Sequence, residues 1–284
     1  MSNTFEPWNA QLTLAFTAQS CGRTVLARNR HEGPLLVQKA LYPEGPAICH
    51  ATILHPPSGI AGGDHLSMDI ELAQGSHAVL STPGATRWYK SNGHPATQRV
   101  ALRLDTNARL DWLPQENIFF EHADAASHTC LDIHSGACAI GWDITQLGRI
   151  GQAGHWNEGH VLLDSRATLD GDVIWLESGE LDADSPLRRS HNGLADFPVM
   201  ATLWAFGPAL SDEHIDTLAA ALPWTRTLRA GMTQLPQKAG QALHLLRILG
   251  LHAQQVRQLL ISLWMQLRPL VMRTPGAALR LWNT

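Results

Sequence analysis

The chain of 284 residues lacks the sequence signatures of the common enzyme classes. It contains no GxSxG nucleophile motif, no HExxH zinc motif, no P-loop and no GxGxxG segment after a strand. Its four cysteines, Cys21, Cys49, Cys130 and Cys138, include no CxxC pair, and a chain of this size does not need disulfides to hold a core. We therefore expect free thiols and no tightly bound cofactor.

Long apolar runs and charged residues are also scarce. No run reaches the ~18 apolar residues of a membrane span, and no charged segment followed by an apolar one opens the sequence. Only 16% of the residues are charged, whereas 44% are hydrophobic, as is typical of a globular chain with a substantial core. These features predict a cytoplasmic protein without a membrane partner.

Acidic side chains are missing from the carboxyl end. All 25 Asp and Glu lie at or before Asp216, and eight of the 21 Lys and Arg follow it. The first part therefore carries a net −12 and the remainder +8. These basic residues form no run and accompany no nucleic-acid motif, so we expect no nucleic-acid partner. A basic region of this kind favours docking on an acidic surface, in this chain or in a partner.

Short strands separated by turn residues fill most of the chain. Apolar residues alternate with polar ones in residues 66–72, and Asp170-Gly171 joins two apolar runs as a hairpin turn does. Such runs recur every roughly 8–12 residues without helices between them. The pattern predicts a mainly β fold with a large multi-stranded body, either a sandwich or a coiled, β-helix-like sheet.

Helical periodicity appears only in the carboxyl-terminal third. Residues 211–221 predict one helix, and apolar residues at helical spacing in 256–267 predict another, which Arg268-Pro269 should end. Residues 241–249 fit either a helix or a strand. We therefore expect one domain over residues 1–284, with a β body at about 11–206 and a helix-containing part at about 207–284.

The 15 histidines are scattered and predict no fixed metal site. His50 and His55 lie at the two ends of one strand, so their side chains should point to opposite faces. Carboxylates are better candidates. Asp64 follows Gly62-Gly63 in a turn, and Glu177 follows an apolar run. A carboxylate in such surroundings needs either a partner or a function, and bonding within its own turn is the simpler interpretation for Asp64.

Several motifs resemble those of the urease accessory proteins of the UreD (UreH) family. These motifs are YPEG, CH and LHPPSGIAGGD within residues 42–64, TPGATRWY at 82–89, LDWLPQE at 110–116, GWD followed by LGR at 141–149, and LRLW at 279–282. The resemblance extends from about residue 33 to the end. It departs from the family at His155, where a glutamate is usual, and at Leu279, where a proline is usual.

This resemblance implies a scaffold without catalytic activity. Family members join UreF and the GTPase UreG on apo-urease, as a hetero-oligomer with two copies, and pass nickel through an internal passage to the urease active site. Transient nickel is the only metal this implies. By position, Asp64 and Glu177 are the candidate residues of the passage. The basic, Leu- and Trp-rich helix suits an interface anchor for UreF, which makes Arg257, Leu260, Trp264 and Arg268 candidate partner-binding residues. The alternative interpretation of this helix is that it only covers the β body.

Two other functional classes remain open from the residues alone. A metal-dependent hydrolase or isomerase on a β-barrel would use His50, His55, Asp64 and Glu177. A carbohydrate-binding β-sandwich would use some of the ten tryptophans.

Overall fold

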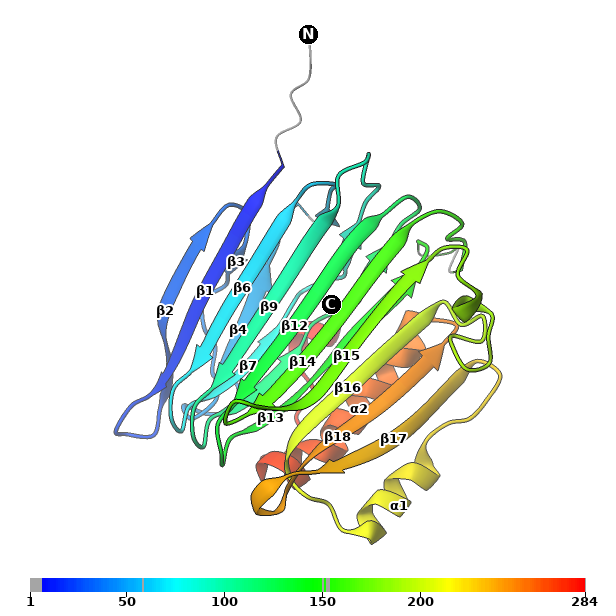
Figure 1. The fold of residues 1–284 in the computed structure, drawn as a ribbon. Helices are drawn as coiled ribbons and strands as arrows, with labels where there is room; N and C mark the ends of the chain where they lie inside the picture. The colour runs from blue at the N-terminus through cyan, green and yellow to red at the C-terminus, as the bar shows by residue number, and fades with distance from the viewer. Residues whose placement is uncertain (1–6, 58, 150, 152–153, 284) are drawn as a thin grey trace.

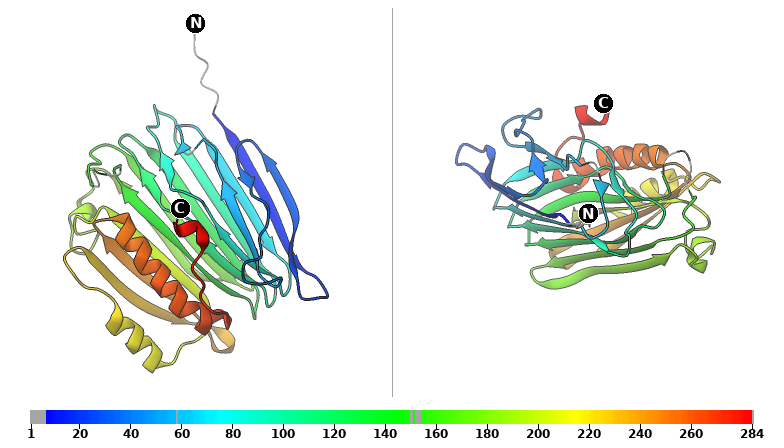
Figure 2. Two further views of the ribbon diagram at one scale, coloured as in Figure 1. Left: turned by 180° about the vertical axis from the view of Figure 1, so that it is seen from behind. Right: turned by 90° about the horizontal axis from the view of Figure 1, so that it is seen from above.

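The chain winds its strands into a flattened coil of two facing sheets (Figure 1; Figure 2, right). A computed structural model describes residues 7–57, 59–149, 151 and 154–283. One sheet has seven strands, in the order β15 (Asp172–Asp182), β14 (His160–Leu169), β12 (Asp124–Ile133), β9 (Ala96–Leu104), β6 (His65–Leu72), β1 (Asn9–Ala18) and β2 (Thr24–Glu32).

The opposite sheet has eleven strands. Its main path runs through β17 (Leu228–Pro236), β18 (Gln241–Gly250), β16 (Val199–Pro208), β13 (Cys138–Leu147), β10 (Arg109–Leu113), β7 (His77–Ser81), β4 (Cys49–Leu54) and β3 (Leu36–Val37). Three short strands connect the sheets and pair in parallel with one another: β5 (Gly59–Ile60), β8 (Thr86–Trp88) and β11 (Asn117–Phe119). The chain thus alternates between the sheets in parallel turns, and the β-helix-like prediction is confirmed.

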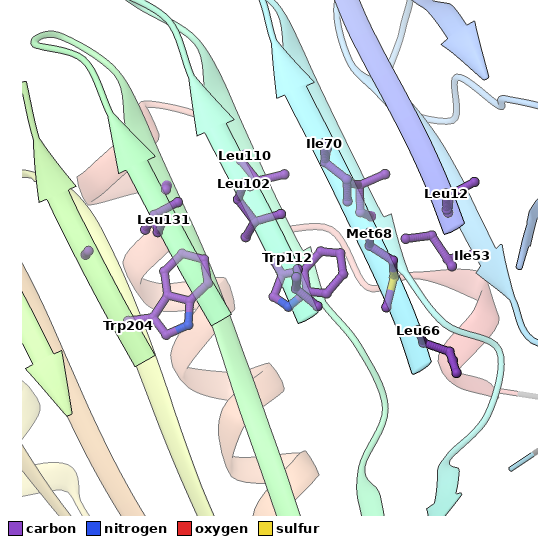
Figure 3. Close-up of a cluster of buried hydrophobic side chains, with 14 of the residues drawn as sticks. Leu12, Ile53, Leu66, Met68, Ile70, Leu102, Leu110, Trp112, Leu131 and Trp204 are labelled. Atoms are coloured by element: carbon purple, nitrogen blue, oxygen red, sulfur yellow. The ribbon is translucent and has the colours of Figure 1, made fainter. Parts of the chain in front are cut away.

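Parallel register stacks equivalent side chains in rows between the sheets. One row of the seven-stranded sheet joins Leu14, Ile70, Leu102, Leu131 and Ala167, all of which are buried. Tryptophans and leucines of the other sheet meet these rows. Figure 3 labels part of this core: Leu12, Ile53, Leu66, Met68, Ile70, Leu102, Leu110, Trp112, Leu131 and Trp204. This burial is the main source of stability, because removal of apolar surface from water scales with its area.

The second core lies outside the coil. Helix α2 (Ala253–Met272) packs across β13, β16 and β18, on the outer face of the eleven-stranded sheet (Figure 2, left). Its apolar stripe includes Val256, Leu260 and Leu267, each fully buried. The shorter α1 (Asp212–Ala221) lies beside β17, and 3-10 turns occupy Pro186–Arg188, Lys238–Gly240 and Arg280–Asn283. Both predicted helices are confirmed.

At the carboxyl end the structure decides one open alternative and corrects one prediction. Gln241–Gly250 forms a strand, and the eleven-stranded sheet therefore continues past Phe206 through β18 and β17. The prediction that Arg268-Pro269 ends the helix is wrong, because α2 continues to Met272 and stops at Arg273, whose φ is 53°. A proline removes one helical hydrogen bond, whereas Val271 and Met272 are buried against the sheet and hold the last turn.

Gly62 allows the chain to approach its own backbone at the turn before β6. A Cβ at this position would overlap the carbonyl group of Ser91. We expect Gly62→Ala to lower the free energy of unfolding by about 3 kcal/mol, the upper range for overpacking. Gly84→Ala is the matched control, because a Cβ there meets nothing within 4 Å. Urea unfolding measures both, and equal stabilities would contradict the close approach.

Candidate functional site

An inner cavity of about 140 Å³ lies between the two sheets. Apolar side chains such as Met68 and Trp112 form part of its wall. Its polar lining residues come mostly from the connections between the sheets: His55, Thr82, Thr86, Gln98, Gln115, Asn117 and Asp143. The TPGAT segment singled out in the sequence therefore forms one wall of an internal space.

A larger cleft of about 750 Å³ opens where the two sheets end without pairing to each other, at β15 and β17. The exposed side chains of Leu187 and Trp224 border it. Polar side chains enter its largely apolar wall, because the side-chain rows change character along the seven-stranded sheet. The row that begins with Leu12, Met68 and Val100 continues as Thr129, Ser165 and Glu177.

Two residues line both the inner cavity and the cleft, namely Asn117 and Asp143. Asn117 is fixed by the indole nitrogen of Trp88, which donates to its side-chain oxygen at 3.0 Å. Asp143 lies on β13 at an inward position, in register with Thr202 and through it with Arg247. The cleft and the inner cavity therefore adjoin each other at these two side chains.

Asp143 is the titratable group most affected by this interior. Burial raises its pKa to about 6, and the nearby charge of Glu177 acts in the same direction, while Trp204 opposes them. A carboxyl with a pKa near neutrality can hold or release a proton as a cation arrives or leaves.

Glu177 lies in the wall of the cleft, as part of a charged pair. Its carboxylate accepts hydrogen bonds from the guanidinium of Arg247 and, at 3.2 Å, from the indole nitrogen of Trp175. Arg247 is on β18 of the opposite sheet, so the pair bridges the two sheets across the cleft. The structure thus brings Glu177 close to Asp143.

Asp64, the other predicted passage residue, has a different environment. Its two carboxylate oxygens accept hydrogen bonds from the backbone amides of Trp8 (2.9 Å) and Ala61 (2.8 Å). It is buried and does not line either space. Its charge nevertheless acts on the imidazole of His55, which does line the inner cavity. Asp64 therefore holds the turn that flanks the cavity, and a direct contact with an ion stays a prediction.

The histidines considered for a barrel enzyme are separated. His50 faces out of the coil and shares a 2.7 Å hydrogen bond with Glu44, whereas His55 faces the inner cavity. Among the described residues, no three His, Cys, Asp or Glu side chains come together as a metal site requires. Most of the tryptophans serve packing, since Trp88, Trp142, Trp156, Trp204 and Trp264 are buried, whereas Trp8 and Trp224 are exposed.

Three of the four predicted partner-binding residues are buried within this chain. Leu260, Trp264 and Arg268 have no exposed surface. Arg257 keeps 32% of its side chain exposed and bonds to Gln115 (2.8 Å) and Glu116 (3.2 Å). Partner binding by these residues stays a prediction, and the structure gives the three buried ones a role in holding α2 on the sheet.

A buried ion cluster forms around Arg268. Its guanidinium contacts Asp111 at 3.0 and 3.1 Å and Glu44 at 2.6 and 3.1 Å. Asp111 also accepts hydrogen bonds from the indole of Trp264 (2.7 Å) and shares one with His77 (2.9 Å). Burial alone would raise the pKa of Glu44, but the hydrogen bonds from His50 and Arg268 hold it at about 2. The cluster ties α2 to β10 and to the turn before β4.

Sequence reasoning did not select Asp143. A signal was present, because Ala139, Gly141 and Asp143 occupy the same face of β13 and a carboxylate in an inward row requires an explanation.

No helix in the described part of the chain is long and apolar enough to cross a membrane.

Comparison with known proteins identifies the family. The model of the family described as UreD urease accessory protein matches residues 9–283. Urease accessory protein UreD of Bordetella pertussis is 51% identical over 284 residues, which cover all of both chains. The protein of that name from Ralstonia nicotianae is 50% identical over 99% of this chain and 95% of its own, and that from Cupriavidus necator is 49% identical over 98% and 95%. The chain therefore belongs to the UreD family of urease accessory proteins, which are non-catalytic factors of urease maturation.

Proposed function

We propose that this protein conducts nickel ions through its interior, from partner proteins to the active site of apo-urease. The ion passes between the cleft and the inner cavity. Asp143 is the central ligand of the path, and Glu177 attracts the cation within the cleft. Oxygen ligands and water suit this task, because they hold a divalent ion weakly enough to release it.

One observation carries this proposal: Asn117 and Asp143 stand in the walls of both spaces. A binding site for a resident metal would gather its ligands in one place, whereas here the polar groups follow the gap between the sheets. The net charge of −12 in residues 1–216 also favours entry of a cation.

The partners in this proposal are UreF, the GTPase UreG and apo-urease, in a cytoplasmic hetero-oligomer with two copies. Energy from GTP hydrolysis would come from UreG, since this chain has no P-loop. Of the predicted partner-binding residues, Arg257 is the one that solvent reaches, and it borders Gln115 in the wall of the inner cavity.

The test compares removal of the negative member with removal of the positive member of the Glu177–Arg247 pair in the cleft. We expect Glu177→Gln to reduce urease activation severalfold, because it leaves Arg247 as an unpaired positive charge in the path. Arg247→Gln breaks the same pair but leaves the cleft more negative, so activation should be kept. Both variants are co-expressed with UreF, UreG and apo-urease, with co-purification as the control for assembly. Equal losses in the two variants would indicate a structural role of the pair and contradict conduction.

A further inference from the structure

Among the described residues, His55 is the one imidazole that lines the inner cavity, and both of its ring nitrogens are buried without a hydrogen-bond partner there. Leaving a buried polar group unpaired costs about 1–3 kcal/mol. Native proteins keep such groups rarely, and each one calls for an explanation. An imidazole in the wall of a cavity, with both nitrogens unpaired, is suited to a ligand that is bound only part of the time.

The surroundings favour a cation as this ligand. The cavity of about 140 Å³ has room for an ion with a few water molecules, each of which occupies about 30 Å³ in the liquid. The polar residues Thr82, Thr86, Gln98 and Asp143 line the same space.

The imidazole is also kept in the form that binds metals. Burial lowers the pKa of His55, against a smaller opposing effect of the Asp64 charge, and this favours the neutral ring. Pro56 and Pro57 follow directly and fix the backbone angle φ at their own positions, which stiffens the loop that carries the ring.

We propose that His55 is the nitrogen ligand of a transient cation-binding site in the inner cavity. Through His55, this site selects borderline divalent ions such as Ni²⁺ over Mg²⁺. The inference rests on the proposed function and adds the origin of its selectivity. A path of oxygen ligands alone would admit Mg²⁺, which prefers carboxylate, carbonyl and water, whereas imidazole suits nickel and zinc. A single nitrogen, with water and oxygen completing the shell, binds the ion and then lets it go.

The test measures metal binding rather than urease activity. The full-length chain, purified with UreF where that is needed for solubility, is titrated with NiCl₂ against a chromophoric chelator, with and without excess MgCl₂. We expect His55→Gln to weaken Ni²⁺ binding at least about tenfold, as loss of groups in a metal's shells does, and to leave competition by Mg²⁺ stronger than in the unchanged protein. His128→Gln is the matched control, because His128 lies on the outer face of β12 and pairs with Asp164 at 3.0 Å.

Two further arms keep the outcomes separate. His55→Leu removes the unpaired nitrogens, so it should be at least as stable as the unchanged protein by thermal unfolding and equally impaired in Ni²⁺ binding. Unchanged Ni²⁺ affinity in both variants overturns the inference. If Ni²⁺ binding and activation survive the His55 substitutions while Asp143→Asn and Glu177→Gln reduce activation, the proposed His55 site is refuted and the proposed passage is retained. If the His55 variants bind Ni²⁺ more weakly while the Asp143→Asn protein activates urease normally, the proposed His55 site is supported and the proposed passage is refuted.

Discussion

Replacing Asp143 by asparagine is expected to make the protein more stable at pH 8 and to reduce urease activation at least about tenfold, the size of effect that loss of one metal-shell group has. Asparagine keeps the shape but removes the buried charge that a divalent ion needs. Removal of that charge ends an electrostatic cost of at most about 3 kcal/mol, for a pKa raised from 3.8 to about 6. Activation is measured by co-expression with the accessory proteins and apo-urease.

The pH dependence of this stability gain checks its cause. Because the folded state raises the pKa of Asp143, the unchanged protein loses stability as the pH rises from about 4 to about 6. The two proteins should therefore be equally stable below pH 4 and differ by a constant amount above pH 7. A gain that is the same at all pH values would indicate a packing effect, and activation at the normal level would exclude Asp143 from the path.

Replacing Arg268 by methionine is expected to lower the free energy of unfolding by about 3–5 kcal/mol at pH 7, the usual loss when one partner of a buried ion pair is removed. Asp111 and Glu44 would keep their charges without the guanidinium that compensates them. The loss should shrink below pH 4, because the pKa of Glu44 lies at about 2 when the cluster is intact and its stabilising effect disappears as the carboxylate is protonated. Urea unfolding at pH 7 and pH 3 measures both values.

Arg257→Met on the same helix is the control. Arg257 is partly exposed and pairs with the buried Glu116, so its removal should cost less than the removal of the fully buried Arg268. Adding Asp111→Asn and Glu44→Gln to Arg268→Met should recover part of the loss, because the uncompensated charges are then removed. A triple variant less stable than Arg268→Met alone would show that the carboxylates stabilise the fold without Arg268. Co-purification of the Arg257→Met protein with UreF also separates partner binding from stability.

The fold was predictable from local patterns where these patterns repeat. Alternation in β6 and the Asp170-Gly171 turn indicated strands and a hairpin, and both are present, with φ values of 51° and 89° at the turn. Strand β17 was not predicted, because its sequence LRAGMTQLP is half-buried and lacks a regular alternation. The choice between sandwich and coil depended on which strands pair, and parallel pairing between distant strands leaves no local signal.

The candidate site was predictable only in part, for a related reason. Glu177 follows an apolar run, and its position in the cleft agrees with a role in the path. Asp143, by contrast, stands out as a site residue only because Glu177 and Thr129 line the same cleft. These two residues come from other turns of the coil. The basic helix looked like a partner surface because Arg268 lies among leucines, whereas its compensating charge comes from Asp111 and Glu44 far away in the sequence.

Nickel transfer in the presence of an external chelator tests the central claim most directly. An accessory complex loaded with ⁶³Ni is mixed with apo-urease and excess EDTA, and radioactivity is measured in the urease recovered. Conduction through the interior predicts that transfer by the unchanged protein persists, because the chelator cannot enter, and that transfer by the Asp143→Asn protein is lost. Interception of the nickel by EDTA with the unchanged protein, or normal transfer by Asp143→Asn, would contradict a path between the sheets.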